Sequence, residues 1–202
     1  MTKIKLCGLS RICDIEFVNE LKPEYIGFVF AQKSKRYVSP DKVAKLKQLL
    51  DNDIQAVGVF VNENPKTIAD FLNNDMIEIA QLHGDEDENY IKRLRQLTDK
   101  PIIKAFCMKT ASDIVAVENS IADYVLLDSG AGTGMVFNWK LIQNIKRPYF
   151  LAGGLSPNNV KDAVKNLHPF AVDVSSGIET NGLKDKIKMS AFIAGIRKED
   201  RL

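Results

Sequence analysis

The chain has 202 residues, and 45% of them are hydrophobic, which is enough to bury the core of one sizeable domain. The 28 Lys and Arg residues nearly balance the 26 Asp and Glu residues, and the formal net charge of +2 is too small to indicate a nucleic-acid-binding or membrane-binding surface. No apolar run is long enough for a secretory signal or a bilayer span, so we expect a cytoplasmic protein. Because no linker-like or low-complexity segment divides the chain, residues 1–202 are predicted to form a single domain.

Cysteine and histidine are both scarce in this chain. The three cysteines, Cys7, Cys13 and Cys107, form no Cys-x-x-Cys pair, and an odd number cannot be fully paired within one chain. A reducing compartment fits this pattern best. His83 and His168 are far apart and have no spacing typical of a metal site, so we predict no bound metal.

Eight short apolar runs, rich in Val, Ile, Phe and Tyr, alternate with helix-like segments along the chain. Several of these runs are continuously apolar, as is typical of parallel strands that are buried on both faces. Their ends recur roughly every 24 residues, the length that a compact strand–helix unit needs. The predicted strand ends lie near Cys7, Phe30, Phe60, His83, Cys107, Asp128, Gly153 and Ser175.

Helix-start signals occupy the gaps between these runs. Ser39, Asn64 and Ser156 are each followed by proline, a pattern that places a cap residue before the first helical position. The segments after them carry apolar residues at three- and four-residue spacing. A last helix is expected within residues 183–196.

Eight strand–helix units in one domain predict an α/β fold of the (β/α)8 TIM-barrel type. The alternative is an open, doubly wound sheet. That fold would carry a G-x-G-x-x-G fingerprint directly after the first strand, where this chain has CGLSR. The later GAGTG segment, at residues 130–134, has the wrong spacing and is interpreted as a mobile loop.

Two predicted strand ends are followed only by residues with small side chains. Gly153 and Gly154 follow the seventh run, and Ser175, Ser176 and Gly177 follow the eighth. Backbone N–H groups in such turns can point at one bound anion, and the phosphate site of TIM barrels often lies after strands seven and eight. These five residues are therefore the predicted phosphate site, although Gly and Ser also form ordinary turns.

Cys7 and Asp128 are the candidate reactive groups, because each ends an apolar strand where a barrel has its active site. Lys5 lies two residues before Cys7, on the same strand face, and is predicted to favour the thiolate. A buried cysteine that only fills space is the alternative. A carboxyl group that is shielded from water has a raised pKa and can act as a general acid near neutral pH.

Four further polar residues follow or end the predicted strands. Arg36, in the segment KSKRYVSP, can hold a carboxylate or phosphate through two hydrogen bonds, or belong to a solvated basic loop. His83 is a candidate substrate-binding residue, and a bond to neighbouring backbone is an equal alternative. Cys107 is interpreted as apolar filler, and Asp173 as a structural partner deeper in the barrel.

The chain resembles the phosphoribosylanthranilate isomerases of tryptophan biosynthesis over residues 5–185. The resemblance is carried by the segments KLCG, SKRYVSP, VGVFVN, QLHG, LLDSGAGTG, FNW, LAGGLSPNNV and DVSSGIETNGLKD. It implies an Amadori rearrangement of N-(5-phosphoribosyl)anthranilate to an open-chain 1-deoxyribulose 5-phosphate derivative, without a cofactor or metal. It also implies that Cys7 is the general base, that Asp128 is the general acid and that Arg36 holds the anthranilate carboxylate.

The sequence departs from this family at two positions. Lys35 stands where members usually have proline, which would loosen the loop that presents Arg36. Asn138 stands where they usually have aspartate, and Asn serves equally well as a helix cap. Neither position is the implied acid or base.

Two other functions are compatible with a phosphate-binding barrel. An enzyme that forms carbon–carbon bonds, such as indole-glycerol-phosphate synthase, would have a Lys and Glu pair at strand ends, where this chain has Cys7 and Asp128. A non-catalytic sensor would keep the phosphate site but would not need both residues. We expect a monomer, since no exposed apolar stripe is readable in the sequence, and the expected partner is a small phosphorylated sugar–anthranilate substrate.

Overall fold

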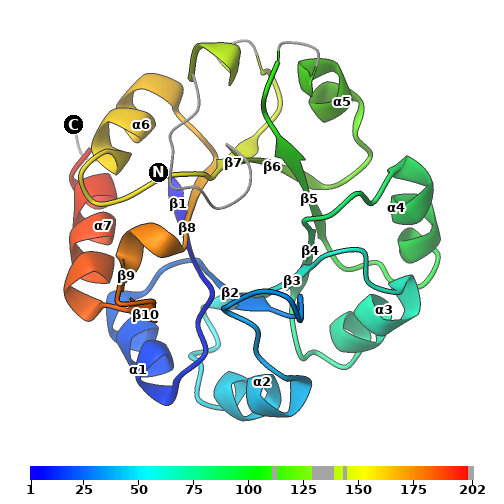
Figure 1. Ribbon diagram of the computed structural model, residues 1–202, viewed down its shortest axis with the longest axis horizontal. Coiled ribbons are helices and arrows are strands. Elements are labelled where there is room, and N and C mark those ends of the chain that lie inside the picture. The colour runs from blue at the N-terminus through cyan, green and yellow to red at the C-terminus, as the bar shows by residue number, and fades with distance from the viewer. Residues whose placement is uncertain (111–112, 129–138, 143–144, 200–202) are drawn as a thin grey trace.

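The computed structural model describes residues 1–110, 113–128, 139–142 and 145–199, and it contains a closed barrel of eight parallel strands (Figure 1). Each strand pairs with the next in sequence, and β8 closes the ring against β1. The predicted TIM barrel is therefore confirmed. The strands are β1 (Lys3–Cys7), β2 (Tyr25–Val29), β3 (Gln55–Phe60), β4 (Ile79–Leu82), β5 (Ile102–Cys107), β6 (Tyr124–Asp128), β7 (Tyr149–Leu151) and β8 (Ala171–Val174).

The helices form an outer ring around the barrel (Figure 1). In the described part of the chain, the segment between β6 and β7 contains only the short 3-10 helix η1 (Trp139–Ile142). The predicted GAGTG loop and Asn138 lie outside the described residues. The α-helices are α1 (Ile12–Leu21), α2 (Pro40–Lys47), α3 (Pro65–Asn73), α4 (Glu88–Arg95), α5 (Asp113–Asn119), α6 (Val160–Leu167) and α7 (Lys186–Glu199).

Two of the three predicted helix starts are confirmed. α2 begins at Pro40 and α3 begins at Pro65, each directly after its cap residue. The start predicted at Ser156 is wrong, because α6 begins at Val160. The Asn159 side chain accepts a hydrogen bond from the Ser156 N–H at 2.9 Å, which holds the intervening residues in a turn.

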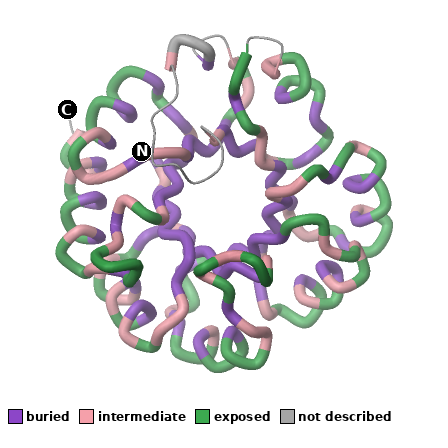
Figure 2. The backbone as a smooth tube through the Cα atoms, in the orientation of Figure 1, coloured by how far each residue is buried: buried purple, intermediate pink, exposed green. Residues whose placement is uncertain are grey.

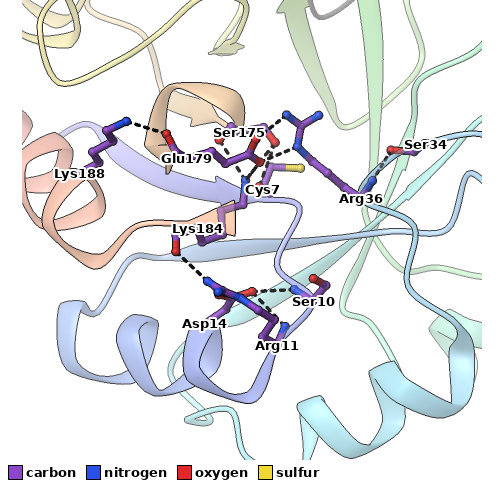
Figure 3. A network of polar contacts seen from close by, with 10 residues as sticks. All are labelled: Cys7, Ser10, Arg11, Asp14, Ser34, Arg36, Ser175, Glu179, Lys184 and Lys188. Atoms are coloured by element: carbon purple, nitrogen blue, oxygen red, sulfur yellow. Dashed lines mark hydrogen bonds and ion pairs between the residues drawn. The ribbon is translucent and has the colours of Figure 1, made fainter. Parts of the chain in front are cut away.

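A small insertion separates β8 from α7. It contains the 3-10 helix η2 (Ser176–Ile178) and a hairpin of β9 (Glu179–Thr180) and β10 (Leu183–Lys184). The hairpin lies beside α1, because the Arg11 side chain donates a hydrogen bond to the Lys184 carbonyl at 2.7 Å (Figures 1 and 3). No helix in the described ranges is long and apolar enough to cross a membrane.

The core has two apolar layers, because successive strand residues point alternately into the barrel and toward the helices. The outer layer joins strand residues to helix residues such as Ile15 and Val18. The inner layer is built almost wholly from strand residues, among them Tyr25, Phe150 and Leu126. Figure 2 shows that most of the barrel strands are buried. The inner layer fills part of the barrel interior with apolar side chains.

Candidate active site

A cavity of about 250 Å³ opens at the carboxyl ends of the barrel strands. Parallel strands of a barrel all end at the same face, so side chains far apart in sequence converge there. The wall includes both candidate reactive groups, both candidate substrate-binding residues and four of the five predicted phosphate-site residues. These are Cys7, Asp128, Arg36, His83, Gly153, Gly154, Ser175 and Ser176.

Cys7 ends β1 and is 7% exposed. Gly27 lies opposite it in the parallel register of β2. A Cβ atom at Gly27 would lie 2.6 Å from the Cys7 Sγ atom, so only glycine leaves room for the thiol. Gly27 is not among the predicted site residues, although a glycine inside a strand often marks a close approach of another group.

Lys5 and Asp173 form a buried ion pair next to Cys7, with 3.0 Å between Nζ and Oδ1. Burial lowers the pKa of Lys5, but Asp173 and Cys7 together outweigh this effect and the net pKa is raised. Burial also raises the pKa of the Cys7 thiol, which Lys5 lowers and Asp173 raises. Lys5 thus acts in the predicted direction. The net pKa of the thiol is nonetheless raised, because desolvation and the Asp173 charge outweigh Lys5.

Arg36 is held by a carboxylate that the sequence analysis did not identify, Glu179 (Figure 3). Arg36 Nε donates to Glu179 Oε1 at 2.6 Å, and Nη2 donates to Oε2 at 2.8 Å. Lys184 Nζ donates to Glu179 Oε1 at 2.6 Å and to the Ser175 carbonyl at 2.9 Å. No described residue accepts a hydrogen bond from Arg36 Nη1, and the side chain is 31% exposed. Arg36 is therefore fixed in place while part of its guanidinium stays available to a ligand.

Arg36 and Lys184 keep Glu179 negatively charged. Burial raises the pKa of the Glu179 carboxyl, but the hydrogen bonds from Arg36 and Lys184 outweigh it, and the net pKa is lowered. Burial lowers the pKa of Lys184, and Glu179 only partly restores it. At neutral pH the carboxylate therefore stays ionised and orients Arg36.

His83 lies just after β4 and links two other residues of the cavity wall. Its Nδ1 atom is 2.8 Å from Gln81 Nε2, and its Nε2 atom is 3.3 Å from Asp128 Oδ2. Neither contact was predicted from the sequence. Gln81 could have been identified from strand periodicity, because residues two apart share a strand face.

The two predicted phosphate turns are in direct contact. Gly153 and Gly154 have φ values of 83° and 67°, a region that favours glycine. A Cβ atom at Gly177 would lie 1.9 Å from the Leu155 carbonyl oxygen, so the second turn packs against the first. Among the described residues, none accepts a hydrogen bond from the backbone N–H of Gly153, Gly154, Ser176 or Gly177. Unpaired N–H groups clustered in this way suit an anion.

Cys107 differs from its predicted role as apolar filler. It is exposed at the end of β5, opposite Asp128 in the strand register. The prediction is wrong because β5 extends past the apolar layers to the rim of the barrel. Within the described ranges, no three His, Cys, Asp or Glu side chains are grouped so that they could hold a metal ion.

Comparison of the sequence with known proteins identifies its family. The sequence profile of the family described as N-(5'phosphoribosyl)anthranilate (PRA) isomerase matches residues 4–195. The N-(5'-phosphoribosyl)anthranilate isomerase of Endomicrobium trichonymphae is 44% identical over 202 residues, which cover 98% of this chain and 99% of the relative.

Solved structures give the same result. The phosphoribosyl anthranilate isomerase of Thermotoga maritima matches with a TM-score of 0.88 and 34% identity, over 98% of this chain and 100% of that chain. A second such isomerase, in complex with reduced 1-(o-carboxyphenylamino)-1-deoxyribulose 5-phosphate, matches with a TM-score of 0.86 and 34% identity over the same shares. The profile match and these relatives, each aligned over nearly its full length, show that the chain belongs to the N-(5'-phosphoribosyl)anthranilate isomerase family.

Proposed function

We propose that this chain carries out the isomerase reaction of its family, in tryptophan biosynthesis, with Asp128 as general acid and Cys7 as general base. The observation that carries the proposal is that one cavity contains a carboxyl group, a thiol, a partly free guanidinium and two turns with unpaired N–H groups. The substrate, N-(5'-phosphoribosyl)anthranilate, has a complementary set of groups: a sugar ring to open, a carboxylate and a phosphate.

The first step is ring opening. Asp128 gives its proton to the ribose ring oxygen, and the bond between that oxygen and C1 breaks. The electron pair of the anthranilate nitrogen then forms a double bond to C1, which leaves a positively charged Schiff base. A positioned acid of this kind typically contributes ~10² to 10⁴-fold to the rate.

The second step is proton removal at C2. The positive nitrogen makes the C2 proton acidic, and the Cys7 thiolate takes it. The released electron pair forms a C1–C2 double bond and neutralises the nitrogen, which gives an enolamine. The enolamine then tautomerises, with a proton added at C1 and the C2 hydroxyl converted to the product ketone. No step needs an electron acceptor, a cofactor or a metal.

The remaining residues bind the substrate. The free edge of Arg36 is suited to the anthranilate carboxylate, since a guanidinium can bind two carboxylates through different N–H groups. Backbone N–H groups of Gly153, Gly154, Ser176 and Gly177 are suited to the phosphate. His83 lines the same cavity and contacts Asp128.

The test is turnover, followed as the loss of substrate fluorescence, with EDTA present to check metal independence. Cys7→Ala and Asp128→Asn are each expected to lower kcat by at least ~10²-fold, because each removes a proton-transfer group. Cys13→Ala on α1 and Asp53→Asn at an exposed position are the matched controls and should retain wild-type turnover. Near wild-type turnover in either test variant would contradict the role given to that residue. Substrate binding without turnover in the wild type would instead indicate a sensor.

We also propose that the chain acts as a monomer in the cytoplasm. The cavity is lined by residues of one chain, so the proposed chemistry does not require a second copy. Light scattering over a range of protein concentrations is expected to give the mass of one chain, and a mass of two chains would contradict the proposal.

A further inference from the structure

We propose that Gln81 is a positioning residue that fixes the tautomer of His83, so that the His83 Nε2–H group donates a hydrogen bond to Asp128. Three residues of the cavity wall form this chain of contacts: Gln81 lies in β4, His83 follows β4, and Asp128 ends β6. The catalytic meaning of this chain of contacts rests on the proposed role of Asp128 as the acid.

The tautomer follows from the donor and acceptor chemistry of the three groups. The Gln81 Nε2 amide nitrogen lies 2.8 Å from His83 Nδ1 and can only donate. In this arrangement a neutral His83 accepts at Nδ1 and carries its single proton on Nε2. His83 Nε2 lies 3.3 Å from Asp128 Oδ2, so that proton points toward the carboxyl group.

The burial of Gln81 carries a cost in stability, because one of its polar atoms has no partner in the described part of the chain. Gln81 is 1% exposed, and its Oε1 atom is buried without a hydrogen-bond partner among the described residues. Its neighbours in the strand register are Val59 and Ile103, which offer no polar group in exchange. A methionine here would fill similar space without an unpaired oxygen. What the amide provides, and an apolar side chain would not, is the donor to His83.

The tautomer matters because Asp128 changes charge during ring opening. When Asp128 gives up its proton, the His83 Nε2–H group faces a carboxylate, and a hydrogen bond to a charged acceptor is stronger than one to a neutral acceptor. The contact therefore strengthens as the proton leaves, which stabilises the transition state more than the ground state. The other tautomer would turn the Nε2 lone pair toward the developing negative charge. Gln81 prevents this orientation without touching the substrate atoms that react.

The direct test is nitrogen NMR of protein labelled with ¹⁵N-histidine. The chain contains only His83 and His168, and His168 ends α6 with a φ of 44°, a conformation that Asn tolerates. A His168→Asn variant therefore assigns the His83 signals. At about pH 8, above the ordinary titration range of imidazole, wild-type protein is expected to show an unprotonated Nδ1 and a protonated Nε2.

Two substitutions move the tautomer in different ways. Gln81→Met keeps the size of the side chain but removes the donor, so the His83 signals are expected to shift toward a mixture of tautomers. Gln81→Glu presents a group that only accepts, so a proton is expected on Nδ1. Gln55→Met, at the exposed first residue of β3, is the matched control and should leave the His83 signals unchanged.

Kinetics complete the test. Gln81→Met is expected to lower kcat about tenfold with little change in KM, which is the loss expected for one hydrogen bond to a charged group. A protonated Nδ1 in the wild type would overturn the proposal, as would His83 signals that stay the same in Gln81→Met even if activity falls. The NMR result does not depend on turnover. If the wild type has the expected tautomer but no isomerase activity, the proposed function fails while the positioning of His83 by Gln81 stands.

Discussion

Gly27→Ala is predicted to remove most of the activity by moving the Cys7 thiol. Gly27 lies opposite Cys7 on β2, and a Cβ atom there would lie 2.6 Å from Cys7 Sγ and 3.1 Å from Cys7 Cα. Non-bonded heavy atoms rest at about 3.5 to 4 Å, so the thiol would have to move by about 1 Å. A displacement of that size at a reacting group costs roughly 10²-fold in rate.

The loss is expected to come from geometry and not from unfolding. Adding one methyl group to a packed interior typically costs about 1 to 3 kcal/mol. A domain of this kind has a free energy of unfolding of about 5 to 15 kcal/mol, so most of the variant stays folded. Thermal melting would confirm this before the kinetic comparison.

Two assays separate the thiol from the rest of the site. Turnover is followed by the loss of substrate fluorescence, and alkylation by iodoacetamide reports the thiol directly when Cys13 and Cys107 are replaced by Ser. Gly195→Ala in α7 is the control, because its Cβ would lie 3.4 Å from Val160 Cγ1 and a Gly-to-Ala change within a helix stabilises by up to ~1 kcal/mol. Wild-type kcat in Gly27→Ala would refute the reasoning, since it would show that the position of the thiol does not matter.

Three further predictions concern the charged groups around the cavity. Glu179→Gln removes the charge that orients Arg36, so KM is expected to rise about tenfold with a smaller change in kcat; steady-state kinetics with unchanged KM would contradict this. Lys5→Met combined with Asp173→Leu replaces a buried ion pair by apolar groups at little cost in stability. Because Lys5 lowers the pKa of Cys7 more than Asp173 raises it, the pKa of Cys7 is expected to rise further in the double variant, and alkylation of Cys7 should begin at higher pH. An unchanged pH dependence of alkylation would show that Lys5 does not act on Cys7. In wild-type protein the raised thiol pKa should appear in the pH dependence of kcat/KM, which reports the free enzyme. A lower thiol pKa should appear in the pH dependence of kcat, which reports the enzyme with bound substrate. Equal pKa values in the two profiles would mean that bound substrate does not favour the thiolate.

The barrel and most of the cavity wall could be predicted because they follow from local patterns. An apolar run that stops at a polar or small residue marks both the end of a strand and, in a parallel barrel, a position at the mouth. Cys7, Asp128 and the Gly153 turn were found in this way, and the structure brings them to one cavity. The departure at α6 is local: the N–H groups of Asn159 and Val160 both donate to the Ser156 carbonyl, and the Asn159 side chain accepts from the Ser156 N–H, so one separate turn precedes the helix.

Other features depend on contacts that no local pattern encodes. Glu179 reaches Arg36 across 143 residues of sequence, and the segment GIET that contains Glu179 gives no sign of this partner. The net rise of the Cys7 pKa could not be predicted from the sequence for a related reason. A lysine two residues away on a strand indicates a favourable charge, but the cost of burial and the presence of Asp173 become visible only in three dimensions.

A buried thiol with a raised pKa is compatible with a base that acts second. In the free enzyme the Cys7 thiol stays mostly protonated, because burial disfavours the thiolate more than Lys5 favours it. In the proposed reaction, ring opening by Asp128 creates a positive charge on the substrate in the same cavity, and a nearby positive charge favours the thiolate. The base thus becomes stronger when the substrate has become a carbon acid, and at rest it is less open to oxidation and alkylation, which attack the thiolate. On this view the Lys5–Asp173 pair keeps the charge beneath Cys7 close to neutral, so that the substrate, and not the resting protein, determines when the thiolate forms.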